Sequence, residues 1–230
     1  MRPRIVLATE SLDPSGMGQH MLTLGEAVAG EFDVTLAAPS ADGGATLLRS
    51  AAERGLGVKS LEPGFGDWLR AFAPALIHVH AGIGWEGHGL VRSASAAGVP
   101  VVRTEHLPYL ITSVVQQAEY RAMLLSVHQR IAVSQAVADS HRGRGAGRLK
   151  VVPNGIAPQA AQRSRAETRK ALGIADDEPM VLTVARFAPQ KAHDLLLAAV
   201  PAVLADFPRA RFVLVGTGPE EDAIRAKVEE

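Results

Sequence analysis

The 230-residue sequence contains no cysteine, which excludes disulfide bonds, thiolate metal sites and a cysteine nucleophile. It has 24 basic and 24 acidic residues, and the resulting net charge of zero gives no argument for nucleic-acid binding. No apolar run approaches the roughly 18 residues of a transmembrane helix, and the first apolar run is too short for a signal peptide. We therefore expect a cytoplasmic protein, and peripheral contact with the inner membrane face stays open.

Two nucleophile and cofactor motifs are also absent. No Gly-x-Ser-x-Gly sequence is present, so the sequence gives no support for a hydrolase with a nucleophile elbow. Gly16 and Gly18 begin a dinucleotide-type glycine pattern, but its third position is Met21. The strand expected at residues 33–38 ends without an acid for a ribose. An NAD site is therefore weakly supported, and a plain turn before a helix is an alternative for these glycines.

Short apolar, β-branched runs alternate with amphipathic segments along the chain. Residues 5–8 form the first such run, a helix is expected from about Gln19, and residues 33–38 form the second run. This alternation predicts an α/β fold, a Rossmann-like parallel sheet with helices on both faces and right-handed crossovers. Six or seven strands are expected before residue 155.

The chain is expected to divide into two units, residues 1–158 and 159–230. An irregular segment containing Pro158 separates them, and a capping box from Ser164 to Glu167 opens the next helix. The second unit contains only about two strands, and two parallel strands leave long unpaired edges. We therefore expect this unit to be incomplete: the chain is a piece of a longer protein, or a partner chain completes the unit.

The second unit carries two cations at the end of its first strand. The apolar run 181–185 ends in Arg186, and Lys191 follows a short loop at the start of an amphipathic helix. A planar guanidinium, a point charge and a helix N-terminus together suit a diphosphate. The alternative is that both are ordinary surface cations.

His80 and His106 each lie at the C-terminal end of a predicted strand, on the same sheet edge as Gly16. Two histidines facing one crevice indicate a functional site, although lone histidines are often structural. His78 precedes His80 on the same strand and is better explained as structural. The remaining histidines have no comparable context, and no spacing argues for a metal site; they include His20, His88, His128 and His141.

These segments follow one another in the order of a known family. The chain resembles the retaining GT-B glycosyltransferases of family 4, also called glycosyl transferases group 1. The resemblance is carried by these stretches: Ser15-Gly16-Met17-Gly18, Leu-Ile-His-Val-His at 76–80, Val-Val-Arg-Thr-Glu-His at 101–106, residues 130–134, residues 150–156, residues 181–194 and residues 211–219.

The resemblance implies a nucleotide-diphosphate sugar as donor, held by the second unit. Arg186 and Lys191 would clamp the diphosphate and stabilise the leaving group, so no metal or other cofactor would be needed. The N–H of Gly16 would lie near the donor phosphate, and Gly216 and Gly218 would approach the nucleotide.

The first unit would hold the acceptor, whether a sugar, a lipid or a small molecule. His106 would lie at the donor sugar and reacting centre, while His80 and Gly18 would line the acceptor side. Two alternatives stay open: a non-catalytic module that binds a nucleotide or sugar phosphate, and a nucleotide-sugar epimerase with the GT-B fold.

The sequence departs from the family pattern in several places. Ser15, Ala185 and Ala192 stand where the family usually has glycine. The family's Glu-x7-Glu pair would lie beyond Glu230, so we expect this 230-residue form to be truncated and weakly active.

Overall fold

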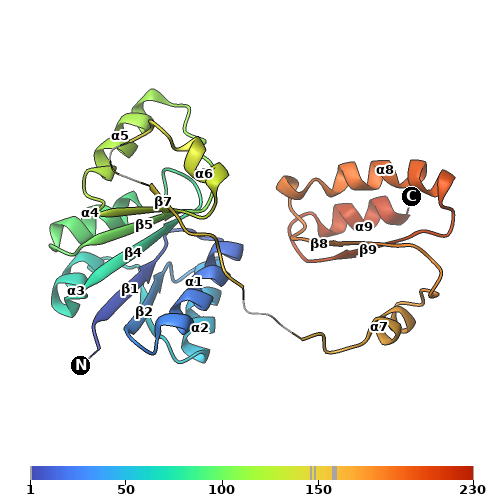
Figure 1. Ribbon diagram of the computed structural model, residues 1–230, viewed down its shortest axis with the longest axis horizontal. Coiled ribbons are helices and arrows are strands. Elements are labelled where there is room, and N and C mark those ends of the chain that lie inside the picture. Colours follow the sequence, from blue (N-terminus) through green and yellow to red (C-terminus); the bar gives the residue numbers. More distant parts are fainter. Residues whose placement is uncertain (1, 146, 148, 157–159, 230) are drawn as a thin grey trace. The chain divides into compact units, whose positions relative to one another are not determined.

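The computed structural model describes residues 2–145, 147, 149–156 and 160–229. The chain divides into two compact units, Met1–Pro158 and Gln159–Glu230 (Figure 1), called unit 1 and unit 2 here. In the described ranges, no helix combines the length and the apolar character needed to cross a membrane.

Unit 1 is built on a seven-stranded sheet whose neighbouring strands all pair in parallel. The strand order is β3-β2-β1-β4-β5-β6-β7, so the direction of winding reverses between β1 and β4. This confirms the predicted α/β parallel sheet. The strands are β1 (Arg4–Ala8), β2 (Asp33–Ala38), β3 (Gly57–Ser60), β4 (Leu76–Ala81), β5 (Val101–Glu105), β6 (Gln129–Ala132) and β7 (Leu149–Val151).

Helices cover both faces of this sheet (Figure 1). Alternate residues of β1 enter different cores, because successive side chains of a strand point to opposite faces. Ile5 and Leu7 pack with residues of α1 and α2, whereas Val6 and Ala8 pack with residues of α3, α4 and α5. The helices of unit 1 are α1 (Ser15–Val28), α2 (Asp42–Glu53), α3 (Phe65–Phe72), α4 (His88–Ala96), α5 (Val114–Leu124) and α6 (Gln135–Ser140).

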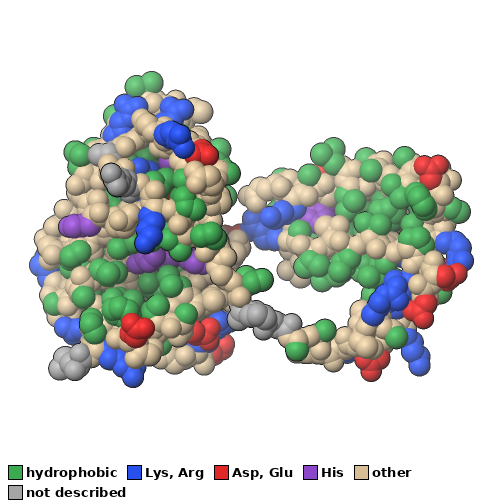
Figure 2. Space-filling view, viewed as in Figure 1, with side chains coloured by type: hydrophobic (Ala, Val, Ile, Leu, Met, Phe, Trp, Pro, Cys, Tyr) green, Lys and Arg blue, Asp and Glu red, His purple; other side chains and the backbone are tan. Residues whose placement is uncertain are grey.

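Unit 2 contains a two-stranded parallel sheet, β8 (Met180–Val184) and β9 (Arg211–Val215). Its helices are α7 (Arg165–Ala171), the 3-10 turn η1 (Pro189–Lys191), α8 (His193–Asp206) and α9 (Glu221–Glu229). The predicted capping box is present at the start of α7: the Ser164 hydroxyl accepts from the Glu167 N–H, and the Glu167 carboxylate accepts from the Ser164 N–H. Many apolar side chains of unit 2 are exposed, among them Val181, Leu182, Val184 and Leu195. Figure 2 shows hydrophobic side chains gathered on the visible surface of this unit.

Two predicted boundaries were wrong. Helix α1 begins at Ser15 rather than near Gln19, so Gly16 and Gly18 lie in its first turn and not in a loop. The helix expected from about Gln190 is interrupted, because η1 ends at Lys191 and Ala192 adopts a positive φ of 51° before α8 begins. An α-helix cannot continue through a left-handed residue.

Candidate functional site

The carboxyl ends of β1 and β4 lie side by side at the point where the strand order reverses. In open α/β sheets, ligands bind in the crevice outside the strand ends at such a point. The segment after β1 leads into α1, and the residue after β5 is His106. The sheet therefore places the start of α1, the end of β4 and His106 at one edge.

His80 and His106 contact each other directly at this edge. The Nδ1 atom of His80 lies 3.1 Å from the Nε2 atom of His106, at hydrogen-bonding distance. The His80 side chain is fully buried in the sheet, and the backbone N–H of His106 donates to the carbonyl of Ala81 at 2.9 Å. The backbone bond fixes the main chain at His106, and the contact between the two rings joins the imidazoles to each other.

His20 completes a cluster of three imidazoles. Its ring centroid lies 5.6 Å from that of His80 and 5.2 Å from that of His106. One ring nitrogen from each histidine lies within 4.8 Å of the other two. We call His20, His80 and His106 the histidine trio. From the sequence, His20 was grouped with the histidines that have no comparable context; in the structure it lies beside His80 and His106.

His78 stands beside the trio in a structural role. Its Nε2 atom lies 2.7 Å from the Thr104 hydroxyl, and its ring stacks on that of His80 with a centroid separation of 4.1 Å. This contact agrees with the prediction that His78 is structural.

Burial keeps these imidazoles neutral at physiological pH. Desolvation lowers the pKa of His78 to about 3 and the pKa of His106 to about 4, with a further lowering from the nearby His20. Burial also lowers the pKa of His80 well below its ordinary value, and that of His20 to a smaller extent. Neutral imidazoles offer nitrogen lone pairs to a ligand without first losing a proton.

A buried polar network supports the strand end that carries His106. Arg103 donates to the Glu105 carboxylate, and the Tyr120 hydroxyl donates to the same carboxylate at 2.8 Å. His141 contacts the Tyr120 hydroxyl and, through Nε2, the carbonyl of Leu107 at 3.2 Å. Burial alone would raise the pKa of Glu105, but Arg103 holds that pKa below its ordinary value. The network therefore fixes the residues on both sides of His106.

Helix α1 begins with the exposed residues Ser15 and Gly16, and no described side chain caps this helix start. A Cβ atom added to Gly16 would meet nothing within 4 Å, whereas one added to Gly18 would lie 3.1 Å from Pro14 and 3.3 Å from Leu47. Ser15 has a φ of 30°, in the region that favours glycine. Gly16 therefore offers open backbone, and Gly18 is needed for packing against Pro14.

Arg186 and Lys191 lie in the loop at the carboxyl end of β8: Arg186 precedes η1, and Lys191 is the last residue of η1. Arg186 is half-buried and donates from Nη2 to the Gln190 amide oxygen at 3.2 Å, while Lys191 is exposed. No described side chain caps the start of α8. An edge-to-face contact between Phe187 and His193, with centroids 5.1 Å apart, holds that helix start beside the loop. The loop thus carries both cations next to an uncapped helix N-terminus.

Gly216 and Gly218 allow the loops after β8 and β9 to touch. A Cβ atom on Gly216 would lie 1.9 Å from the Ala185 carbonyl oxygen, and one on Gly218 would lie 2.2 Å from the Phe187 carbonyl oxygen. The Phe187 N–H donates to the Thr217 carbonyl at 2.8 Å. The structure therefore gives both glycines a packing reason, and their predicted approach to a nucleotide stays a prediction.

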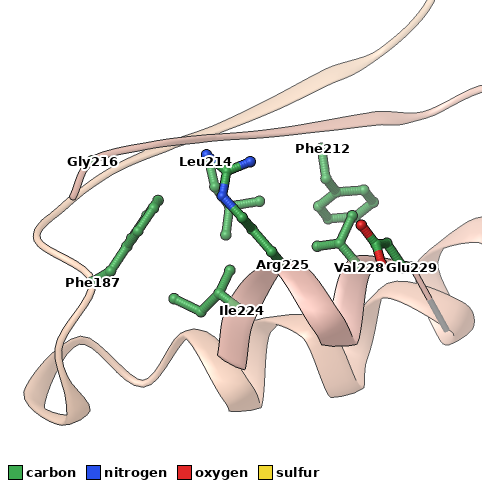
Figure 3. A pocket seen from close by; sticks show the side chains of 8 residues that line it. All are labelled: Phe187, Phe212, Leu214, Gly216, Ile224, Arg225, Val228 and Glu229. Carbon is green, nitrogen blue, oxygen red and sulfur yellow. The ribbon is translucent and has the colours of Figure 1, made fainter. Parts of the chain in front are cut away.

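A pocket of unit 2 lies next to Gly216 but does not include the two cations (Figure 3). Its lining is mainly apolar and comes from β9, α9 and Phe187. The charged residues Arg225 and Glu229 of α9 also line it. Phosphate groups need donors and positive charge, so this pocket is the less suitable place for a diphosphate.

Each unit of the chain matches a known protein-family model. The model described as Glycosyltransferase Family 4 matches residues 14–160, and the one described as Glycosyl transferases group 1 matches residues 164–230. The chain belongs to glycosyltransferase family 4.

Several curated glycosyltransferases are similar to this family 4 chain. D-inositol 3-phosphate glycosyltransferase of Geodermatophilus obscurus is 29% identical over 182 residues, which cover 73% of this chain and 37% of that protein. A GDP-mannose-dependent mannosyltransferase of Corynebacterium glutamicum, named for a monoacylated phosphatidylinositol monomannoside, is 36% identical over 66 residues, 29% of this chain and 17% of that protein. The chain thus spans well under half the length of these relatives.

Solved structures share the fold of this family 4 chain. Anabaena HepE in complex with UDP and glucose superposes with a TM-score of 0.74 at 18% identity, over 99% of this chain and 65% of that chain. A putative UDP-N-acetylglucosamine 2-epimerase from Listeria monocytogenes gives 0.64 at 12% identity, over 99% and 65%. These likenesses confirm the GT-B fold class.

The structure brings the predicted residues together within each unit. His80 and His106 touch in unit 1, at the sheet edge where α1 and its Gly16 begin, and Arg186, Lys191, Gly216 and Gly218 surround the loops after β8 and β9 in unit 2. His20 had no assigned role in the sequence; it lies in α1, the helix that follows β1, which begins at this same sheet edge.

Proposed function

We propose that this family 4 chain is a glycosyltransferase that moves a sugar from a nucleotide-diphosphate sugar to an acceptor with retention of configuration. The observation that carries the proposal is the loop after β8, where Arg186 before η1 and Lys191 at the end of η1 lie beside the uncapped start of α8. Two cations and free helix N–H groups stabilise a diphosphate leaving group as the glycosidic bond breaks.

The remaining roles follow from the positions of the residues. Gly16 lies in the first turn of α1, with open space beside its Cα atom, and a helix N-terminus suits a donor phosphate. His106, half-buried at the sheet edge, is proposed to contact the donor sugar at the reacting centre. His80 and Gly18 are assigned to the acceptor side, and Gly216 and Gly218 to the nucleotide. The two cations neutralise the diphosphate, so no metal is proposed at that group.

Nucleotide binding gives the sharpest test, because it requires no knowledge of the acceptor. Isothermal titration calorimetry with UDP, GDP and ADP in the presence of EDTA should show one preferred diphosphate. Arg186→Ala combined with Lys191→Ala should weaken its affinity at least about tenfold, since each charge-assisted hydrogen bond contributes about 1.5–3 kcal/mol. Arg209→Ala, which removes an exposed cation paired with Asp177, is the matched control and should bind as the wild type does.

Unchanged affinity in the double variant, or no binding of any diphosphate, would count against the clamp. Transfer itself is tested with the preferred nucleotide sugar and acceptors that include D-inositol 3-phosphate and phosphatidylinositol, the compounds named for the relatives above and for the phosphatidylinositol N-acetylglucosaminyltransferase subunit of Schizosaccharomyces pombe. Retention is read from the anomeric configuration of the product by NMR.

A further inference from the structure

Helix α5 turns apolar side chains toward solvent. Val114 is 80% exposed and Leu125 is 78% exposed, and the two lie three turns apart on one stripe of the helix. The helix packs on the core of unit 1 through other residues, among them Tyr120 and Leu124. A surface helix normally presents charged and polar side chains to solvent. Packing within unit 1 therefore does not account for the outer face of α5.

Exposed apolar side chains continue from α5 onto the neighbouring segments. They include Leu107 and Leu110, which precede α5, and Trp85 after β4. Trp85 lies beside α5, because it lines with Gln116 and Ala122 a cavity of about 590 Å³. Contiguous exposed patches of this kind mark sites that bind proteins or membranes. We call this set the apolar face; its members are Trp85, Leu107, Leu110, Val114, Val115 and Leu125.

Basic residues accompany the apolar face. Residues 107–150 contain six Lys or Arg and only two Asp or Glu, although the whole chain has 24 of each kind. Exposed Arg121 shares the stripe of Val114, and the guanidinium of exposed Arg144 lies 5.1 Å from the centre of the Tyr109 ring. Within the described residues, neither arginine forms an ion pair. Figure 2 shows Lys or Arg and hydrophobic side chains together at the end of unit 1 that carries α5 and α6.

We propose that the apolar face and its arginines bind an anionic lipid membrane. Apolar side chains of a surface helix enter the boundary between head groups and acyl chains, and arginines beside them pair with lipid phosphates. Tryptophan favours the same depth. The excess of basic residues requires an anionic partner, and an anionic bilayer offers negative charge and apolar chains in one layer.

Membrane binding at this surface also brings lipid head groups close to the sheet edge of unit 1. Leu107 directly follows His106, the residue after β5. A lipid acceptor would then be presented beside the acceptor side proposed above. The membrane proposal does not rest on sugar transfer, because vesicle binding is measured with neither a donor nor an acceptor present.

The first test is co-sedimentation of the full chain with lipid vesicles. One set contains phosphatidylcholine alone, and the other also contains about one-third phosphatidylglycerol. Because each basic residue near an anionic surface strengthens binding about fivefold, the anionic vesicles should bind at least about tenfold more tightly. Binding should weaken as salt is added. Equal binding to both sets, or no binding to the anionic set, would overturn the proposal.

Apolar variants locate the contact. Val114→Ser combined with Leu125→Ser should weaken binding to anionic vesicles at least about tenfold, because both side chains lose their transfer into the lipid layer. Val58→Ser combined with Leu195→Ser is the matched control, since it changes two exposed apolar residues on β3 and α8. An equal loss in both double variants would show non-specific adhesion and contradict the assigned surface.

Basic variants test the electrostatic part. Arg121→Gln combined with Arg144→Gln should weaken binding at least about tenfold and reduce its salt dependence. Arg49→Gln combined with Arg70→Gln, which removes exposed arginines of α2 and α3, should bind as the wild type does. Circular dichroism confirms that each variant is folded. Wild-type binding by the first pair would refute the role of these arginines.

Trp85 reports on the contact directly. The chain has two tryptophans, so Trp68→Phe leaves Trp85 as the tryptophan that emits. Brominated lipid should quench its fluorescence, and an unquenched Trp85 in vesicle-bound protein would place the contact elsewhere. Failure to bind vesicles, together with self-association that Val114→Ser and Leu125→Ser abolish, would assign the face to a second copy of the chain and overturn the membrane proposal.

Discussion

The guanidinium of Arg103 donates to both carboxylate oxygens of Glu105, at 2.9 Å from Nε and 3.2 Å from Nη2. The two residues are two positions apart on β5, so their side chains share one face of the sheet. Both side chains are buried, and Arg103 also donates to the carbonyls of Glu86 and Gly84. This pair links β5 to the segment after β4. His106 follows β5 directly, and His80 lies near the end of β4.

Breaking this pair should strongly destabilise unit 1. Glu105→Ala leaves Arg103 buried and unpaired, which is expected to lower the free energy of unfolding by about 3–5 kcal/mol. Urea denaturation followed by circular dichroism measures the change. Asp139→Ala is the matched control, because it removes the carboxylate of an exposed ion pair with Arg142 and should cost about 1 kcal/mol or less. Similar losses in both variants would show that burial does not govern the Glu105 pair.

Stability should fall as the pH is lowered below about 6.5. The pKa values of His78 and His106 are about 3 and about 4 in the fold, whereas an unfolded histidine has a pKa of about 6.5. Between these values the unfolded chain binds protons that the folded chain does not, so protonation favours unfolding. For His78 alone, the free energy of unfolding should decrease by up to about 1.4 kcal/mol per pH unit.

Urea midpoints measured from pH 7.5 to pH 4.5 in the presence of EDTA test this pH dependence. His78→Asn should flatten the decline. A stability that is constant over this range would contradict the neutral, buried state of these imidazoles.

Two residues where the family usually has glycine adopt backbone angles that favour glycine. Ala192 has a φ of 51° and Ser15 a φ of 30°. A left-handed conformation costs a non-glycine residue about 1–3 kcal/mol. Glycine removes this strain, but it loses more conformational entropy on folding, which offsets part of the gain. Ala192→Gly and Ser15→Gly should therefore each raise the free energy of unfolding, by about 1 kcal/mol. Ala199→Gly, an exposed position inside α8, should lower it by about 1 kcal/mol, and a fall at Ala192 would contradict the strain.

The contact between the loops of unit 2 should not tolerate a methyl group at Gly216. Gly216→Ala places a Cβ atom 1.9 Å from the Ala185 carbonyl oxygen, so backbone must move, at a cost of about 1–3 kcal/mol. Gly16→Ala has open space and should leave stability unchanged or raise it by up to about 1 kcal/mol. Thermal unfolding separates the two, and an unaffected Gly216→Ala would show that the loops are not in close contact.

Much of the fold was predictable because the strands are strongly patterned. The run at 33–38 was predicted with the bounds of β2, since Pro39 stops an uninterrupted buried segment. The start of α1 was missed because Pro14, Ser15 and Gly16 are typical of turns. The break at Ala192 was missed because alanine gives no sign of a positive φ.

Side-chain surroundings were harder to predict than strand positions. An amphipathic helix would be expected to bury its leucines, yet Leu195 of α8 is 68% exposed, because the two-stranded sheet of unit 2 covers little of that helix. His20 was missed for a different reason. Its contact with His80 joins residues 60 positions apart, and strand order rather than local pattern brings them together.

The central position of β1 also constrains how unit 1 folds. β1 pairs with β2 on one side and with β4 on the other. During synthesis, the apolar segment 4–8 therefore stays partly unprotected until residues 76–81 have left the ribosome. Pairing across so long a loop carries a large entropic cost, so we expect slow refolding from denaturant and a nascent chain that benefits from chaperone binding.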